Sequence, residues 1–85
     1  MKETYTYYPK GTCSTEMIFE LEDGYVRSLK VVSGCNGNLK GIASLVKDMP
    51  IEEVIARLDG ITCGMKPTSC PDQIAKGLAE YQAGR

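Results

Sequence analysis

The first third of the chain carries the residue pattern of a β-sheet. Three segments are rich in β-forming residues or place apolar residues at every second position, namely Thr4–Tyr8, Thr15–Leu21 and Tyr25–Val32. Met17, Phe19 and Leu21 share one face of the second segment. Asp23-Gly24, just before the third segment, is typical of a hairpin turn. The pattern predicts three antiparallel strands.

The remainder of the chain follows the three- and four-residue spacing of amphipathic helices. Its three apolar stripes are Leu39, Ile42, Ala43 and Val46, then Ile51, Val54, Ile55 and Leu58, and finally Ile74, Ala75, Leu78 and Tyr81. Pro50 suits the first turn of the second helix, and Ser69 with Asp72 forms a capping-box variant at the start of the third. Gly77 lies within the third stripe, where we expect it to permit a close backbone contact.

Together these elements predict an α+β fold. A three-stranded antiparallel sheet is followed by three helices packed on one of its faces, in the order βββααα. The 85 residues leave room for a single domain spanning residues 1–85. Because such a domain has a small core, disulfides, a metal or a partner often add to its stability.

Charge and hydropathy exclude two classes of partner. Lys and Arg total 10, Asp and Glu total 11 and the net charge is -1, so the basic surplus typical of nucleic-acid binders is absent. No apolar run approaches the roughly 18 residues of a membrane span, and the first residues lack the pattern of a signal peptide. We therefore expect a cytoplasmic protein that binds neither nucleic acid nor membranes. The chain has no His, which excludes Ser-His-Asp and Cys-His catalysis, and we do not expect it to be catalytic alone.

Four cysteines carry the candidate chemistry: Cys13, Cys35, Cys63 and Cys70. All four fall in predicted loops or at the ends of predicted elements, whereas cysteines that act as small core residues more often lie mid-element. Cys13 and Cys35 flank the second and third strands, so we expect them at the same end of that hairpin. Cys63 and Cys70 are close enough in sequence to meet across the turn between them. In a cytosolic chain such a set more often indicates metal or redox chemistry than disulfides.

Four thiolates are soft ligands that suit Zn²⁺ or an iron–sulfur cluster. Since the chain has no His, a zinc site would use four cysteines, or three cysteines with a carboxylate or water. The N-terminal end of a helix stabilises a thiolate, and Cys70 is predicted to lie there. We therefore predict that Cys13, Cys35, Cys63 and Cys70 are metal ligands, with zinc and an iron–sulfur cluster both left open.

The string Thr68-Ser69-Cys70-Pro71-Asp72 resembles the motif that gives the TSCPD-domain family its name. The whole chain is similar to the small stand-alone, four-cysteine members of that family, and the similarity includes the segment from Ser33 to Asn38. The same domain occurs as a C-terminal appendage of adenosylcobalamin-dependent ribonucleotide reductases. The resemblance therefore implies an accessory role in ribonucleotide reduction, with a reductase as the expected partner.

A looser resemblance links the chain to U-type iron–sulfur scaffold proteins, the NifU/IscU type. Their three cluster-binding cysteines would fall on Cys13, Cys35 and Cys70. Thr15 stands where those proteins usually have Asp, and Ser69 stands where they often have His. Cys63 has no counterpart among the three, so the resemblance implies that it replaces a lost ligand and closes the site. The expected partner is then a cluster-handling protein.

Three functions follow from these observations. The first is a metal-binding module with all four cysteines as ligands. The second is a thiol-redox relay in which Cys63 and Cys70 cycle between dithiol and disulfide and pass electrons to a reductase. The third is an accessory component of a B12-dependent ribonucleoside-diphosphate reductase. A structural or adaptor domain with incidental thiols is the remaining alternative, and the sequence predicts no oligomeric state.

Overall fold

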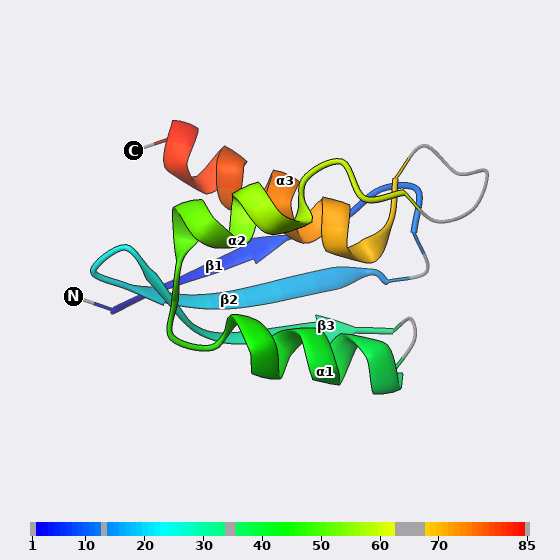
Figure 1. The fold of residues 1–85 in the computed structure, drawn as a ribbon, viewed down its shortest axis with the longest axis horizontal. Coiled ribbons are helices and arrows are strands. Elements are labelled where there is room, and N and C mark those ends of the chain that lie inside the picture. The colour runs from blue at the N-terminus through cyan, green and yellow to red at the C-terminus, as the bar shows by residue number, and fades with distance from the viewer. Residues whose placement is uncertain (1, 13, 34–35, 63–67, 85) are drawn as a thin grey trace.

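The computed structural model describes residues 2–12, 14–33, 36–62 and 68–84. Its elements are β1 (Lys2–Tyr7), β2 (Glu16–Glu22), β3 (Tyr25–Val32), α1 (Asn36–Val46), β4 (Met49–Pro50), α2 (Ile51–Leu58) and α3 (Cys70–Ala83). Figure 1 shows α2 and α3 side by side over the sheet, while α1 runs along β3. The predicted α+β class is confirmed. None of the helices among these residues is long and apolar enough to cross a membrane.

The prediction of a three-stranded sheet and a βββααα order is wrong. Among the described residues the sheet has four antiparallel strands in the order β1-β2-β3-β4, because Met49–Pro50, which lies between α1 and α2 in the chain, pairs with β3. Pro50 therefore ends an edge strand and serves as the N-cap of α2, rather than lying in the first turn of that helix. An edge strand tolerates a proline, which has no N–H to donate to a neighbouring strand.

The β2–β3 hairpin fixes the register of the sheet. Asp23 and Gly24 form its two-residue loop with φ values of 54° and 83°, the left-handed conformation that this tight turn requires. Glu22 consequently pairs with Tyr25, and the far end of the hairpin pairs Glu16 with Val32. The hairpin therefore places the beginning of β2 beside the end of β3.

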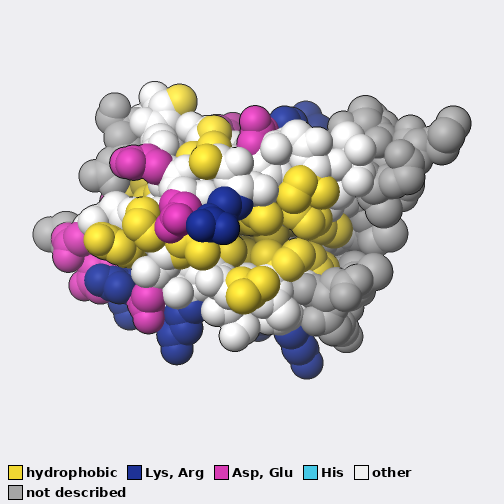
Figure 2. Space-filling model, viewed as in Figure 1, with side chains coloured by type: hydrophobic (Ala, Val, Ile, Leu, Met, Phe, Trp, Pro, Cys, Tyr) yellow, Lys and Arg dark blue, Asp and Glu magenta, His cyan; other side chains and the backbone are white. Residues whose placement is uncertain are grey.

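One apolar core lies between the sheet and all three helices. Its buried members are Met17, Phe19 and Leu21 of β2, Val26 and Leu29 of β3, Val46 of α1, Ile51 and Val54 of α2, and Ile74, Leu78 and Tyr81 of α3. Half-buried apolar residues of α1 and α2, among them Ile42, Ile55 and Leu58, pack against this core. Figure 2 shows apolar side chains reaching the surface between these two helices.

Gly77 allows α3 to pack closely on β1. A Cβ atom at this position would lie 2.8 Å from Cγ of the Tyr7 ring, which is closer than real side chains approach one another. The expected close contact at Gly77 is thus found, and it is made with a side chain rather than with backbone. The aromatic ring of Tyr7 occupies the space that a methyl group would take.

We predict that Gly77→Ala lowers the free energy of unfolding even though alanine favours helices. The helix propensity gain is about 1 kcal/mol, whereas forcing a methyl into packed space costs about 1–3 kcal/mol. The matched control is Gly41→Ala in α1, where an added Cβ meets nothing within 4 Å and should stabilise the fold. Urea unfolding of both variants measures the difference. A stabilised Gly77→Ala protein would contradict the contact.

The side chain of Tyr5, a residue of β1, lies between the sheet and α3. Its ring is 5.3 Å from that of Tyr81 and 6.5 Å from that of Phe19, and its hydroxyl donates to Oε2 of Glu80 at 2.8 Å. Burial, followed by the hydrogen bond to Glu80, raises the pKa of Tyr5 from 10.0 to about 12. The unfolded chain would release this proton first.

We therefore predict that the Tyr5 contribution to stability is complete below about pH 10 and is lost as the pH rises towards 12. Tyrosinate absorbance of the folded protein should show a late titration step. Burial also raises the pKa of Tyr7, so Tyr5→Phe should reduce the amplitude of that step by one tyrosine, and Tyr8→Phe, at an exposed position, should leave the amplitude unchanged. If the late step keeps its full amplitude in Tyr5→Phe, the assignment to Tyr5 is wrong.

Candidate functional site

Cys70 is the one predicted ligand that lies within the described residues. It is the first residue of α3, half-buried, and its thiol is free. Cys13, Cys35 and Cys63 lie outside the described residues, so the four-cysteine site stays a prediction. The residues beside each of them in the chain are described, however, and they show where the cysteine-bearing segments begin and end.

The Thr-Ser-Cys-Pro-Asp string builds the start of α3. Ser69 is the N-cap, and its Oγ accepts a hydrogen bond from the Asp72 N–H at 3.2 Å, as the capping pattern predicts. The same hydroxyl donates to the Ile61 carbonyl at 2.6 Å. Ser69 thereby fixes the first turn of α3 and also holds the described chain on both sides of residues 63–67 together.

Asp72 does not close the capping box by reaching back to the Ser69 backbone. Its buried carboxylate instead accepts hydrogen bonds from the Thr68 hydroxyl and from the Gly60 N–H at 2.7 Å, and it contacts Lys76 Nζ at 3.3 Å. The Thr68 hydrogen bond, then that of Gly60, and the Lys76 charge hold the pKa of Asp72 below its usual value against the effect of desolvation. Asp72 is therefore a charged acceptor with its partners already in place.

Ser14 brings the start of β2 against Cys70. Its buried hydroxyl lies 3.3 Å from the Cys70 Sγ and 3.0 Å from the Thr12 hydroxyl. Thr15 next to it donates its N–H to the Val32 carbonyl at 3.0 Å and its hydroxyl to Ser33 Oγ at 3.5 Å. The neighbours of Cys13 thus touch Cys70 and also lie beside the end of β3, from which the chain continues to Cys35.

We call this region the cysteine end and define it by the described residues that meet there: Thr12, Ser14, Thr15, Ser33, Ile61, Thr68, Ser69 and Cys70. Figure 1 shows it at the end of the molecule opposite the Asp23-Gly24 turn. A cavity of about 610 Å³, whose lining includes Glu3, Asp23 and Tyr81, lies at that opposite end and takes no part in the cysteine end.

Gln73 was not anticipated from the sequence. Its side-chain carbonyl accepts from the Lys10 N–H and from the Tyr7 hydroxyl, both at 3.1 Å, and its amide nitrogen donates to Thr68 Oγ at 3.0 Å. Gln73 lies beside the apolar stripe of α3, and its burial is the result of contacts with residues more than 60 positions earlier in the chain. The spacing of apolar residues along the helix therefore does not predict that a polar residue such as Gln73 is buried.

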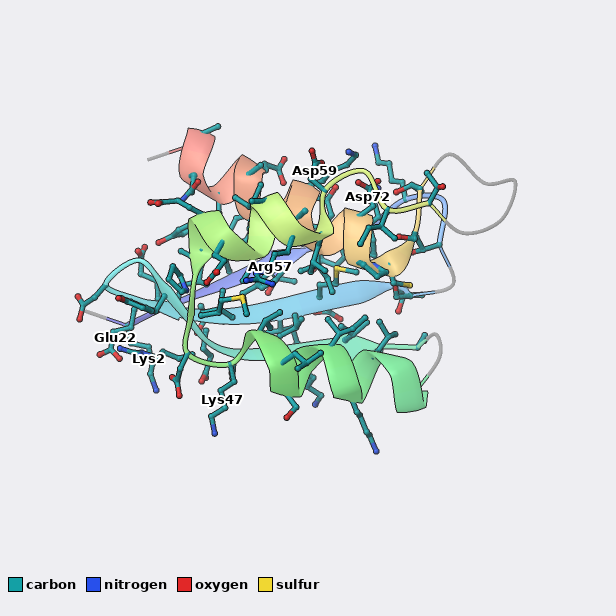
Figure 3. All side chains as sticks on the ribbon, in the orientation of Figure 1. Lys2, Glu22, Lys47, Arg57, Asp59 and Asp72 are labelled. Carbon is teal, nitrogen blue, oxygen red and sulfur yellow. The ribbon has the colours of Figure 1, made fainter. Side chains whose placement is uncertain are left out.

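The described residues offer no competing metal site. No three His, Cys, Asp or Glu residues among them are arranged to hold a metal ion. Figure 3 shows Asp72 and Asp59 at the junction of α2 and α3, and both contact Lys76, at 3.3 and 3.6 Å. The carboxylate nearest to Cys70 in the chain is therefore already neutralised by protein donors.

In the described part of the chain, a four-stranded sheet is covered by three helices, and a free thiol lies at the start of the last helix, which together define a small α+β domain. The TSCPD domain model matches residues 1–82, so the chain belongs to the TSCPD domain family. It matches no curated protein and no solved structure. The looser similarity to NifU/IscU-type scaffolds stays a prediction.

We predict that Asp72→Asn lowers the free energy of unfolding by about 2 kcal/mol, because hydrogen bonds to a buried charge are among the stronger ones and the new amide opposes two donors. Asp59→Asn is the matched control, since Asp59 contacts the same Lys76 from an exposed position and should change stability by less than about 0.5 kcal/mol. Urea unfolding under reducing conditions tests both. Equal losses in the two variants would show that the Asp72 contacts carry no special weight.

Proposed function

We propose that this TSCPD-family protein is a small metal-binding module in which Cys13, Cys35, Cys63 and Cys70 hold zinc or an iron–sulfur cluster as thiolates. The observation that supports the proposal most directly is the 3.3 Å contact between Ser14 and the Cys70 sulfur. This contact joins the neighbour of one proposed ligand to another across 56 positions of sequence.

The other two cysteine-bearing segments start from the same region. Thr15 and Ser33 are hydrogen-bonded at the base of β2 and β3, and Cys35 is two residues beyond Ser33. Ser69 holds Ile61, and Cys63 is two residues beyond Ile61. Consecutive Cα atoms are 3.8 Å apart, so each proposed ligand is separated from the cysteine end by at most two peptide links.

The local chemistry suits thiolate ligands. Cys70 is the first residue of α3, at the positive end of the helix dipole, and a Cys70 thiolate would accept a hydrogen bond from the Ser14 hydroxyl, 3.3 Å away. The nearby Asp72 carboxylate is engaged by Thr68, Gly60 and Lys76, which favours a site built from sulfur alone. A bound zinc ion or cluster would gather four negative thiolates and cross-link a domain whose core is small.

With such a site, the protein would be a structural or scaffold module that acts with another protein, either a reductase or a cluster-handling partner. The alternative is the thiol-redox relay, in which Cys63 and Cys70 form a reversible disulfide without metal. The two functions require different states of the Cys70 sulfur, because a metal ligand must remain a thiolate while a relay must change its oxidation state.

Protein purified without oxygen and without a metal-affinity tag should contain either about one zinc per chain or iron and sulfide with visible absorbance. Elemental analysis and an absorption spectrum distinguish these two results. Each Cys→Ser variant should lose metal and stability together, since the free energy of metal binding is also free energy of folding. Thr62→Ser, an exposed neighbour of Cys63, is the control and should retain both.

Two results would overturn the metal-binding proposal. One is full metal content in all four single variants. The other is metal-free wild-type protein, and a reversible two-electron couple that disappears in Cys63→Ser and Cys70→Ser would then support the relay.

A further inference from the structure

The strongest unassigned feature is a buried chain of hydrogen bonds that runs behind the cysteine end. We infer that Thr68 and Gln73 are positioning residues. They hold Lys10, Gly60 and the first turn of α3 in one arrangement, and so set the affinity of the metal site proposed for the cysteines that follow. The inference rests on the proposed function and adds residues that are not themselves metal ligands.

The series of hydrogen bonds begins at the segment that leads to Cys13. Gln73 Oε1 accepts from the backbone N–H of Lys10 and from the hydroxyl of Tyr7, both at 3.1 Å. Lys10 precedes Cys13 by three residues, and Gln73 follows Cys70 by three. A single amide group therefore links the loop after β1 to the first turn of α3.

Thr68 extends the series of hydrogen bonds towards Gly60, which precedes Cys63 in the sequence. Its hydroxyl accepts from Gln73 Nε2 at 3.0 Å and donates to the Asp72 carboxylate, which in turn accepts from the Gly60 N–H at 2.7 Å. The loop after β1, the loop after α2 and the first turn of α3 thus meet through the side chains of Gln73, Thr68 and Asp72.

The donor and acceptor roles in this series of hydrogen bonds are fixed. A carboxylate cannot donate, so the Thr68 hydroxyl must donate to Asp72 and must accept from Gln73, and Gln73 must then turn its carbonyl oxygen to Lys10 and Tyr7. Among the described residues no buried side-chain nitrogen or oxygen lacks a hydrogen-bond partner. Removal of the Thr68 hydroxyl would leave a donor and an acceptor unpaired in buried surroundings, a state that favours rearrangement of the loops.

Close packing adds to the same constraint. Gly11 lies so near Thr68 that a Cβ on it would be 3.1 Å from the Thr68 methyl group, and its φ of +75° is one that glycine readily adopts. The loop that leads to Cys13 is therefore held against Thr68 on one side and by Gln73 on the other. Residues that orient metal ligands in this way typically change metal affinity by about 10- to 100-fold when they are replaced.

The test uses Co²⁺ as the probe, because cobalt–thiolate charge-transfer and ligand-field bands report both binding and ligand geometry. Thr68→Val keeps the side-chain shape and removes the hydroxyl, and Thr68→Ser keeps the hydroxyl. Gln73→Leu removes the amide. Ile51→Val, a core change at the opposite end of the molecule, controls for a general loss of stability. Competition with a chelator gives each affinity, and urea unfolding without metal gives each stability.

We expect Thr68→Val and Gln73→Leu to bind Co²⁺ about 10- to 100-fold more weakly than wild type and to shift the ligand-field bands. Thr68→Ser and Ile51→Val should keep wild-type affinity and bands. If wild type binds Co²⁺ and Thr68→Val binds it equally well with the same bands, the positioning role is wrong while the metal site stands. If wild type gives no cobalt–thiolate bands, the inference fails, and the proposed function fails as well when the protein purified without oxygen also holds neither zinc nor iron and sulfide. Should Gln73→Leu not fold, the comparison of Thr68→Val with Thr68→Ser still decides.

Discussion

The buried carboxylate of Asp72 is the group on which the arrangement of the cysteine end depends. A charge removed from water must be met by donors, and here the donors come from Thr68, from the Gly60 backbone and from Lys76. Each of these lies on a different part of the chain around α3. The need to satisfy one negative charge therefore brings the loop after α2 against the first turn of α3, and the Cys70 side chain is fixed by the same turn.

The domain divides its stabilising interactions between two regions. Apolar burial is concentrated in the middle, where Phe19 and Met17 are fully covered by the helices. The cysteine end is held by hydroxyl, amide and carboxylate groups. Its buried members Ser14, Thr68 and Ser69 are polar, and so are the buried residues Asp72 and Gln73 beside it. Hydrogen bonds are directional whereas apolar contacts are not, so the polar region specifies geometry while the core supplies most of the free energy of folding.

Local patterns predicted the elements well and the contacts between distant segments poorly. The strand Tyr25–Val32 was predicted with the bounds that the structure shows, since alternation and the Asp23-Gly24 turn are both encoded locally. The two-residue strand Met49–Pro50 is too short to show any period, and its pairing depends on β3. Ser69 was identifiable as a cap from its neighbours. Gln73 was not, because its partners Tyr7 and Lys10 are far away in sequence.

The contacts between β1 and α3 also impose an order on how the protein can be made. Tyr7 and Lys10 emerge early in synthesis, yet the side chain that receives their hydrogen bonds emerges 66 and 63 positions later. The contact between the Ser14 hydroxyl and the Cys70 sulfur likewise joins residues that are 56 positions apart. The strands β1, β2 and β3 can pair while the chain is still growing, but the hydrogen bonds from Tyr7 and Lys10 have no acceptor until Gln73 has been synthesised. The contacts around Cys70 can therefore form only after the first turn of α3 has been synthesised, well after the strands have paired.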